Sequence, residues 1–164
     1  MDIEIREVDF ADAAHCAAIV DVINSYAIEQ VGGGRPLGED VQARLPTALR
    51  DHPTSLVLLA FADGRPVGVA VCFFGFSTFA ARPLLNIHDL AVVPEWRGRG
   101  IGHALLSAAE DRAAQRGCCK LTLEVRDDNG GARRLYERFG FTDFVLEEPT
   151  PTRYLSKTLA RGGP

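Results

Sequence analysis

One short segment of this chain has the residue types that bind a phosphate group. In VVPEWRGRGIGHALL, residues 92–106, three glycines alternate with two arginines between apolar stretches: Gly98, Gly100, Gly102, Arg97 and Arg99. Glycine at this density weakens both strands and helices, so its presence needs a physical reason. A strand, a glycine loop and a helix N-terminus in succession leave backbone N–H groups free, and glycine lets an anion approach them. Because arginines also pair with phosphate, the loop is suited to pyrophosphate.

The pattern excludes two familiar phosphate loops. The chain contains no GxxxxGK[ST] segment, and no GxGxxG opens a strand–helix–strand unit near its N-terminus. What remains is R-x-x-G-x-G, from Arg97 to Gly102. Taken alone, this pattern is also compatible with a glycine-rich turn whose arginines face solvent.

Hydrophobic periodicity predicts the elements that must position this loop. Strand-like segments lie at residues 3–8, 55–62, 66–76, 84–93, 119–126, 141–147 and 152–159. Helical spacing predicts helices over 14–26, 39–50, 101–115 and 131–140. Between the first two helices, VGGGRPLG at residues 31–38 predicts a mobile loop.

The order of these elements predicts an α/β fold with a mixed sheet. Helical crossovers between Val93 and Val125 imply at least one parallel strand pair, whereas a turn at Asp63–Gly64 implies antiparallel pairs. We expect one domain over residues 1–164. Its twisted sheet would be mostly antiparallel, with six to seven strands flanked by about four helices.

Composition limits the expected partners. The net charge of −4 argues against nucleic acid as a partner, because nucleic-acid binding depends on clustered Lys and Arg. The N-terminus MDIEIREVDF lacks the apolar core of a secretory signal, and the apolar runs are too short to cross a bilayer. We therefore predict a cytoplasmic protein with neither a nucleic-acid nor a membrane partner.

The four cysteines predict no metal site. Cys16, Cys72, Cys118 and Cys119 show no spacing typical of zinc ligands. Neighbours such as Cys118 and Cys119 rarely bridge each other, and the other two are isolated in the sequence. We expect small apolar side chains in a reducing compartment.

Two motifs at their proper spacing resemble the GCN5-related N-acetyltransferase (GNAT) family. They are LAVVPEWRGRGIG and, further along the chain, DDNGGARRLYERFGF. The match covers the order of elements from Ile3 to Leu159 and is sharpest between Asn86 and Phe141. The resemblance implies the GNAT fold and an enzyme that transfers an acetyl group from acetyl-CoA to an amine.

The resemblance also implies where acetyl-CoA binds. The glycine loop would hold its pyrophosphate through backbone amides, and the preceding strand would pair with its pantetheine arm. The residues carried over are Leu90, Ala91, Val92, Arg97, Gly98, Arg99, Gly100, Ile101, Gly102, His103, Asn129 and Tyr136. Asn129 is equally suited to cap the helix that follows it, and one residue can do both.

Two residues are expected to carry the chemistry. Tyr136 matches the tyrosine that the family places near the cofactor sulfur, where a phenol can act as general acid toward the departing thiolate. A base is needed because a primary ammonium cannot attack, and His88 or a water chain would serve. Neighbouring strand residues point to opposite faces, so we expect only one of His88 and Asp89 to face the cleft. The structural alternatives are a packed Tyr136, a hydrogen-bonded His88 and a positioning role for Asp89.

Several segments are similar to the diamine and polyamine acetyltransferases within the family. Tyr26 and Glu29 match residues that would contact a cationic amine there, and Phe76 and His88 would also line the substrate site. The chain departs from that branch where His88 replaces a glutamate, and where Ser77, Thr78 or Phe79 stands at an expected acidic position. A small primary amine is the broader expectation.

Two other functions fit the same residues. One is a non-catalytic module that binds acyl-CoA, and the other is an N-acetyltransferase acting on proteins or peptides. The presence of both Tyr136 and His88 favours an enzyme, since a module that only binds needs neither. The resemblance also implies a homodimer.

Overall fold

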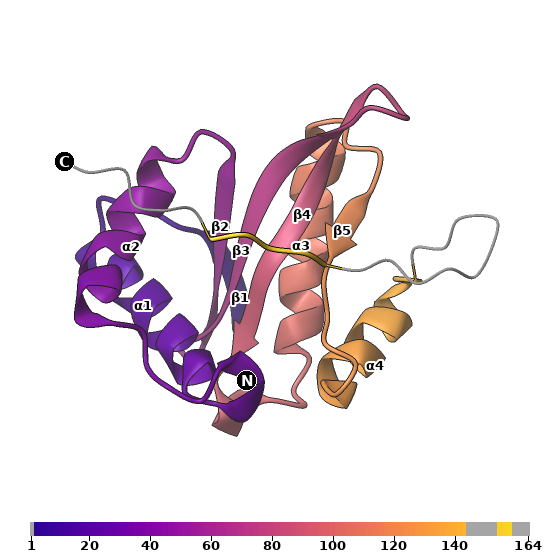
Figure 1. Ribbon diagram of the computed structural model, residues 1–164. Coiled ribbons are helices and arrows are strands. Elements are labelled where there is room, and N and C mark those ends of the chain that lie inside the picture. The colour runs from indigo at the N-terminus through magenta and orange to yellow at the C-terminus, as the bar shows by residue number, and fades with distance from the viewer. Residues whose placement is uncertain (1, 144–153, 159–164) are drawn as a thin grey trace.

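The computed structural model describes residues 2–143 and 154–158 of the chain (Figure 1). The elements follow in the order β1 (Ile3–Glu7), α1 (Ala13–Ala27), η1 (Gln30–Gly32), α2 (Glu39–Asp51), β2 (Ser55–Ala62), β3 (Arg65–Ser77), β4 (Arg82–Val92), η2 (Pro94–Trp96), α3 (Ile101–Gln115), β5 (Leu121–Leu123) and α4 (Gly130–Phe139). Most of the predicted elements are present within a residue or two of their predicted bounds. The predicted loop at 31–38 begins inside the short 3₁₀ turn η1.

The strands form one mixed sheet, which confirms the predicted fold class. Their order is β1-β2-β3-β4-β5, and the first three pairings are antiparallel whereas β4 and β5 run parallel. The β2–β3 hairpin turns at Asp63 and Gly64, whose φ values of 48° and 77° fit the twist of the two strands.

The prediction of six to seven strands differs from the five found in residues 2–143 and 154–158. The expected final pair, over 141–147 and 152–159, lies partly outside the described residues. Its described parts, 141–143 and 154–158, are not in strands. β5 is also shorter than the predicted 119–126, because only Leu121–Leu123 pairs with β4.

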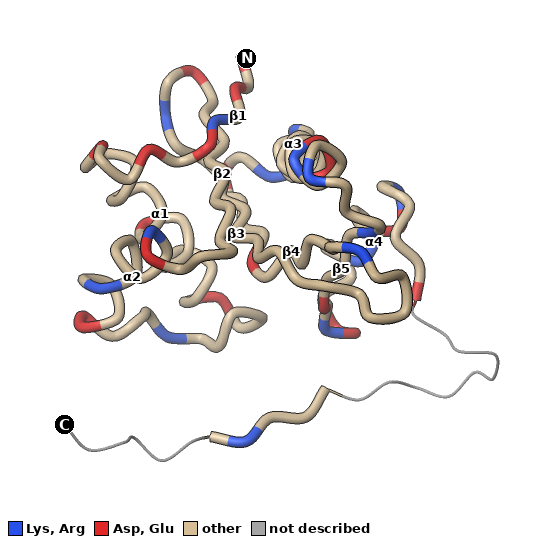
Figure 2. The backbone as a smooth tube through the Cα atoms, turned by 90° about the horizontal axis from the view of Figure 1, so that it is seen from above, with Lys and Arg blue, Asp and Glu red and all other residues tan. Residues whose placement is uncertain are grey.

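Helices cover both faces of the sheet. Seen from above, α3 lies on one side and α1 and α2 lie on the other (Figure 2). Two cores result: Leu58, Leu85 and Leu105 belong to the core under α3. Ile19, Val69 and Ala91 belong to the core under α1 and α2. β4 therefore contributes side chains to both cores.

β4 is longer than its parallel partner β5. The ladder joins Leu85–Ile87 to Leu121–Leu123 and ends there, whereas β4 continues to Val92. Residues 88–92 of β4 therefore pair with β3 on one side and with no strand of the described chain on the other. An edge of β4 that pairs with no other strand of the described chain therefore remains beside α4.

No helix within residues 2–143 and 154–158 combines the length and the apolar character needed to cross a membrane.

Truncating the centre of the α3-side core tests this packing. Leu105 is fully buried against the sheet, so Leu105→Ala should lower the free energy of unfolding by about 2–5 kcal/mol through lost contacts and a cavity. Val41→Ala, at a position that is 37% exposed, is the control and should change it by less than about 0.5 kcal/mol. Urea unfolding measures both, and equal effects would contradict the assigned core.

Candidate active site

A cavity of about 700 Å³ lies along the open edge of β4. It is bounded by the end of α1, the loop after η2, the first turn of α3 and one side of α4. Of the twelve residues expected to hold the cofactor, every one except Arg99 lines it. A cleft of this size is typical of sites for small molecules and cofactors.

The first turn of α3 carries backbone N–H groups that are suited to an anion. Gly100 is the N-cap with φ 86°, a left-handed conformation that favours glycine. The N–H of Ala104 donates a hydrogen bond to Gly100 O at 2.9 Å. The N–H groups of Ile101, Gly102 and His103 therefore have no acceptor inside the helix and point out of its N-terminus. This geometry suits a phosphate group.

Gly102 has a second role, because it lets α3 approach α4 closely. A Cβ added at Gly102 would lie only 2.8 Å from Leu135 Cδ2. The ring of His103, on the same turn, meets Phe139 with centroids 5.1 Å apart. The last glycine of the loop thus brings α4 against the phosphate loop.

Both arginines of the loop are already engaged. Arg97 donates from Nε to Val92 O at 2.9 Å and from Nη1 to Glu29 Oε2 at 2.9 Å, and its Nη2 bonds the other carboxylate oxygen. The hydrogen bonds from Arg97 hold the pKa of Glu29 below its ordinary value. The guanidinium of Arg99 lies 5.0 Å from the ring centre of Trp96. The backbone of the loop is thus freer to bind phosphate than its arginines.

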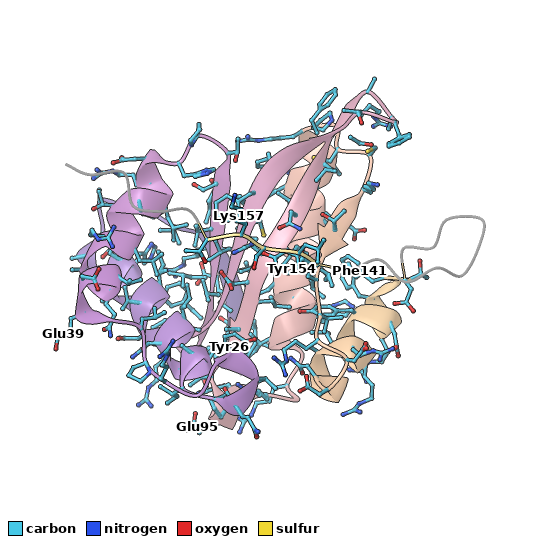
Figure 3. The ribbon with its side chains drawn as sticks, viewed as in Figure 1. Tyr26, Glu39, Glu95, Phe141, Tyr154 and Lys157 are labelled. Atoms are coloured by element: carbon cyan, nitrogen blue, oxygen red, sulfur yellow. The ribbon has the colours of Figure 1, made fainter. Side chains whose placement is uncertain are left out.

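The residues expected to bind substrate do not gather at one place. Tyr26 and Glu29 line the same cavity as the glycine loop, and the Tyr26 hydroxyl lies 3.4 Å from Val31 O. Phe76 stands near the tip of the β3–β4 hairpin, is 63% exposed and does not line this cavity. Figure 3 shows Tyr26 at the end of α1.

A β-bulge changes the expected directions of His88 and Asp89. Val71 pairs with Asp89 and Cys72 with Ile87, so His88 is an extra residue in β4. The His88 ring contacts Phe73 at 5.5 Å, on the side of α1 and α2. Asp89 alternates regularly with Ala91, which belongs to that same core. The expectation of opposite faces is therefore wrong for this pair, because a bulge interrupts the alternation.

Burial shifts the pKa values of Asp89 and Tyr136. Burial raises the pKa of Asp89, an effect that His88 partly offsets. Burial, with smaller contributions from the charges of Tyr26 and Asp89, raises the pKa of Tyr136 to about 12. The Tyr136 phenol therefore stays protonated at neutral pH and can donate a hydrogen bond.

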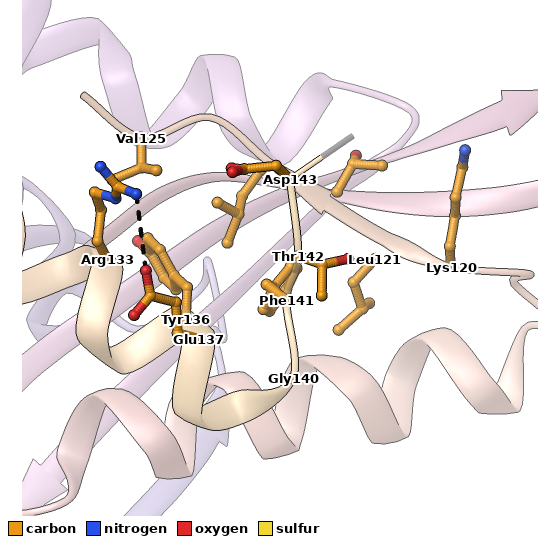
Figure 4. Close-up of a pocket in the computed structure, with 12 residues that line it drawn as sticks. Lys120, Leu121, Val125, Arg133, Tyr136, Glu137, Gly140, Phe141, Thr142 and Asp143 are labelled. Atoms are coloured by element: carbon orange, nitrogen blue, oxygen red, sulfur yellow. Dashed lines mark ion pairs between the residues drawn. The ribbon is translucent and has the colours of Figure 1, made fainter. Parts of the chain in front are cut away.

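Tyr136 separates the first cavity from a second one. This second cavity, of about 800 Å³, lies between β5, α4 and residues 140–143 (Figure 4). Arg133 and Glu137 line it and form an ion pair at 3.8 Å. Tyr136 lines both cavities, the first of which lies along the open edge of β4.

Asn129 fulfils the capping role that the sequence allowed. Its Oδ1 accepts a hydrogen bond from Ala132 N at 3.2 Å at the start of α4. The residue also lines the first cavity, so its role toward a ligand stays a prediction.

Sequence reasoning missed residues on both sides of β4. His52 packs edge-on against Phe73, with centroids 4.8 Å apart, and thereby joins the ring of His88. No sequence signal links His52, at the end of α2, to a strand twenty residues away. Arg134 and Arg138 line the first cavity, and their spacing of four on a helix was the available signal.

Comparison with known proteins decides the family. Residues 19–141 match the family model described as Acetyltransferase (GNAT) family. The chain belongs to this family. It is 35% identical over 139 residues to a Bacillus subtilis (strain 168) protein called uncharacterized N-acetyltransferase YhfO, covering 85% of this chain and 89% of that protein.

Solved structures share the fold at lower sequence identity. An integron cassette protein from the mobile metagenome of V. cholerae superposes with a TM-score of 0.75 at 22% identity, covering 95% of this chain and 94% of that one. An aminoglycoside acetyltransferase from an uncultured soil metagenomic sample, solved in complex with trehalose, has a TM-score of 0.73 at 19% identity and coverage of 94% and 97%. These likenesses concern the fold.

Membership of the family settles part of the expected function. The chain is an acyltransferase of the GNAT family, which uses acetyl-CoA as co-substrate. The alternative of a non-catalytic module is therefore set aside. Neither the family match nor the relatives distinguish the diamine and polyamine branch.

Gly100→Ala tests the anion-binding turn. The alanine must adopt φ 86°, at a cost of about 1–2 kcal/mol, or shift the amides of α3. We expect the affinity for CoA to fall about tenfold or more, measured by calorimetry. Gly64→Ala is a matched control at φ 77° in the β2–β3 turn, and it should lose similar stability with unchanged affinity. Equal losses of affinity in both variants would contradict the site.

The buried Asp89 predicts a pH dependence of stability. Because its folded pKa is raised, Asp89 binds a proton more tightly in the folded state, so its stabilising contribution is lost as the pH rises from about 4 through that pKa. The free energy of unfolding of Asp89→Asn, relative to the native protein, should therefore increase over this range. Asp21→Asn, at an exposed position, is the control. Urea unfolding at several pH values measures both, and a flat difference for Asp89→Asn would refute this.

Proposed function

We propose that this protein acetylates the primary amine of a small molecule, by direct attack of the amine on acetyl-CoA in a ternary complex. The observation that carries the proposal is the position of β4. Leu90–Val92 line the cavity at the open edge, and the bulge just before them presents His88 and Asp89. The residues proposed for the cofactor and those proposed for acid–base chemistry are therefore neighbours on one strand, while His88 and Asp89 themselves lie outside the lining of the cavity.

The cavity suits acetyl-CoA, which when bound supplies an acetyl group activated as a thioester. The free amides at the start of α3 are suited to its pyrophosphate. The unpaired edge of β4 offers backbone groups to the amides of the pantetheine arm, as an added strand would. Arg97 already binds Val92 O, so Leu90 and Ala91 are the freer part of that edge.

His88 is proposed to take the proton from the amine. An alkylammonium has a pKa of about 10 and must lose this proton to become a nucleophile. The imidazole of His88 is exposed on the α1 side of β4, beside Phe73, and can receive the proton directly or through water. Asp89 is proposed to position His88 and to attract the cationic acceptor.

Tyr136 is proposed to stabilise the departing sulfur. Its pKa of about 12 lies well above the value of about 8.5 typical of a thiol. Full proton transfer to the thiolate is therefore unfavourable, and a hydrogen bond from the phenol is the favoured form of assistance.

Direct attack is supported by the state of Cys72 and Cys118. Burial raises the pKa of Cys72 to about 12, so its thiol stays protonated and unreactive. Burial also raises the pKa of Cys118, which lies beyond the far end of α3. Neither cysteine is suited to carry an acyl group.

The acceptor class proposed here is broader than polyamines. The polyamine interpretation relies on Glu29 as a free acidic contact, whereas Arg97 holds both oxygens of that carboxylate. The rings of His52, Phe73 and His88 instead form a short aromatic surface on the acceptor side. The expected homodimer, the cytoplasmic location and the single domain over residues 1–164 stay predictions.

Thiol release with a panel of amines tests the proposal. The panel contains diamines, polyamines, amino acids, aminoglycosides and short peptides, with acetyl-CoA as donor. Release should depend on one class of small amine, and Tyr136→Phe should lower kcat about 100-fold through loss of one hydrogen bond to the sulfur. Tyr154→Phe, at a position that is 76% exposed, is the control and should leave kcat unchanged.

A second variant tests the proposed role of His88 as the base. His88→Gln should lower kcat and remove the titration of the base from the dependence of kcat/KM on pH, while CoA binding is kept. An unchanged profile would remove His88 as the base. Release with peptides alone would replace the small-molecule acceptor by a polypeptide.

A further inference from the structure

The three arginines of α4 differ in what they contact. Arg133 pairs with Asp127 at 3.5 Å and with Glu137 at 3.8 Å, and it faces the second cavity. Arg134 and Arg138 line the first cavity instead, and they form no ion pair with any residue in 2–143 or 154–158. Their spacing of four places them on one side of the helix.

These two arginines flank the phosphate loop. Leu135, next to Arg134, is the residue that a Cβ on Gly102 would meet at 2.8 Å. Phe139, next to Arg138, packs against His103 of the same α3 turn. The Arg134 Nη1 atom lies 3.3 Å from the position of a Cβ on Gly130, so its guanidinium extends back toward the start of α4. Both arginines therefore belong to the wall of the cavity that the first turn of α3 also lines.

The cavity needs another source of positive charge because the loop arginines are engaged. Arg97 is paired with Glu29, and Arg99 lies against Trp96 outside the cavity lining. CoA carries a phosphate monoester on its ribose besides the pyrophosphate, with a charge of about −1.5 to −2 near neutral pH. Backbone amides can hold the pyrophosphate, whereas a separate monoester is matched by guanidinium groups.

We propose that Arg134 and Arg138 bind the 3′-phosphate of CoA. They would make the enzyme select CoA thioesters over 3′-dephospho-CoA thioesters. This inference rests on the proposed function, because it assumes that CoA occupies the first cavity. It assigns phosphate selectivity to α4, outside the R-x-x-G-x-G motif.

Calorimetry with CoA and 3′-dephospho-CoA tests the inference without any turnover. The native protein should bind CoA at least about tenfold more tightly, since charge-assisted hydrogen bonds distinguish the two ligands. Arg134→Ala/Arg138→Ala should lose about tenfold or more of the CoA affinity and keep its affinity for 3′-dephospho-CoA. Arg133→Ala removes the same kind of charge from the same helix and should retain the native preference.

Each other outcome of the calorimetry would refute either the inference about the arginines or the proposed function. Equal affinity of the native protein for both ligands would refute the inference and leave the proposed function standing. An equal loss for both ligands in the double variant would assign the arginines to general attraction or to the pyrophosphate, and would also refute it. Binding of neither ligand by the native protein would refute the proposed function itself. Retained 3′-dephospho-CoA binding shows that the double variant is folded.

Discussion

The parallel pairing of β4 with β5 over only three residue pairs is the constraint on which the site depends. Where the two strands separate, β4 keeps one paired edge and exposes the other. Buried backbone N–H and C=O groups require partners, so an open edge inside the fold is a place for a ligand that can act as a strand. The 700 Å³ cavity follows from that separation.

Helix α3 follows from the same topology. A parallel pair needs a crossover connection, and here the crossover begins with the glycine loop and runs as α3 over the sheet. Its N-terminus must therefore lie at the end of β4 where the strands have separated. Gly102 allows α4 to pack against this turn, which brings Tyr136, Arg134 and Arg138 to the wall of the cavity.

The charged side chains of the site differ in what they contact. Arg97 joins Glu29, just after α1, to Val92 at the end of β4, and so holds the loop between distant parts of the chain. The charges of Arg97 and Glu29 neutralise each other in this ion pair. In the proposed site, anion binding is left to the backbone amides of α3 and to α4. The bulge at His88 turns His88 and Asp89 toward the α1 and α2 side of β4.

The sequence by itself determined the family, the mixed sheet, the strand–loop–helix junction and the glycine turn, because each depends on local periodicity or on a backbone conformation that few residues adopt. Only the tertiary structure decided the pairing of Arg97 with Glu29, the common direction of His88 and Asp89, and the approach of His52 to Phe73. The Arg97–Glu29 pair and the His52–Phe73 contact join residues far apart in the chain. The common direction of His88 and Asp89 depends on the register of β4 with β3. One extra residue in β4 is accommodated there by a bulge, which the alternation of apolar and polar residues in the sequence does not reveal.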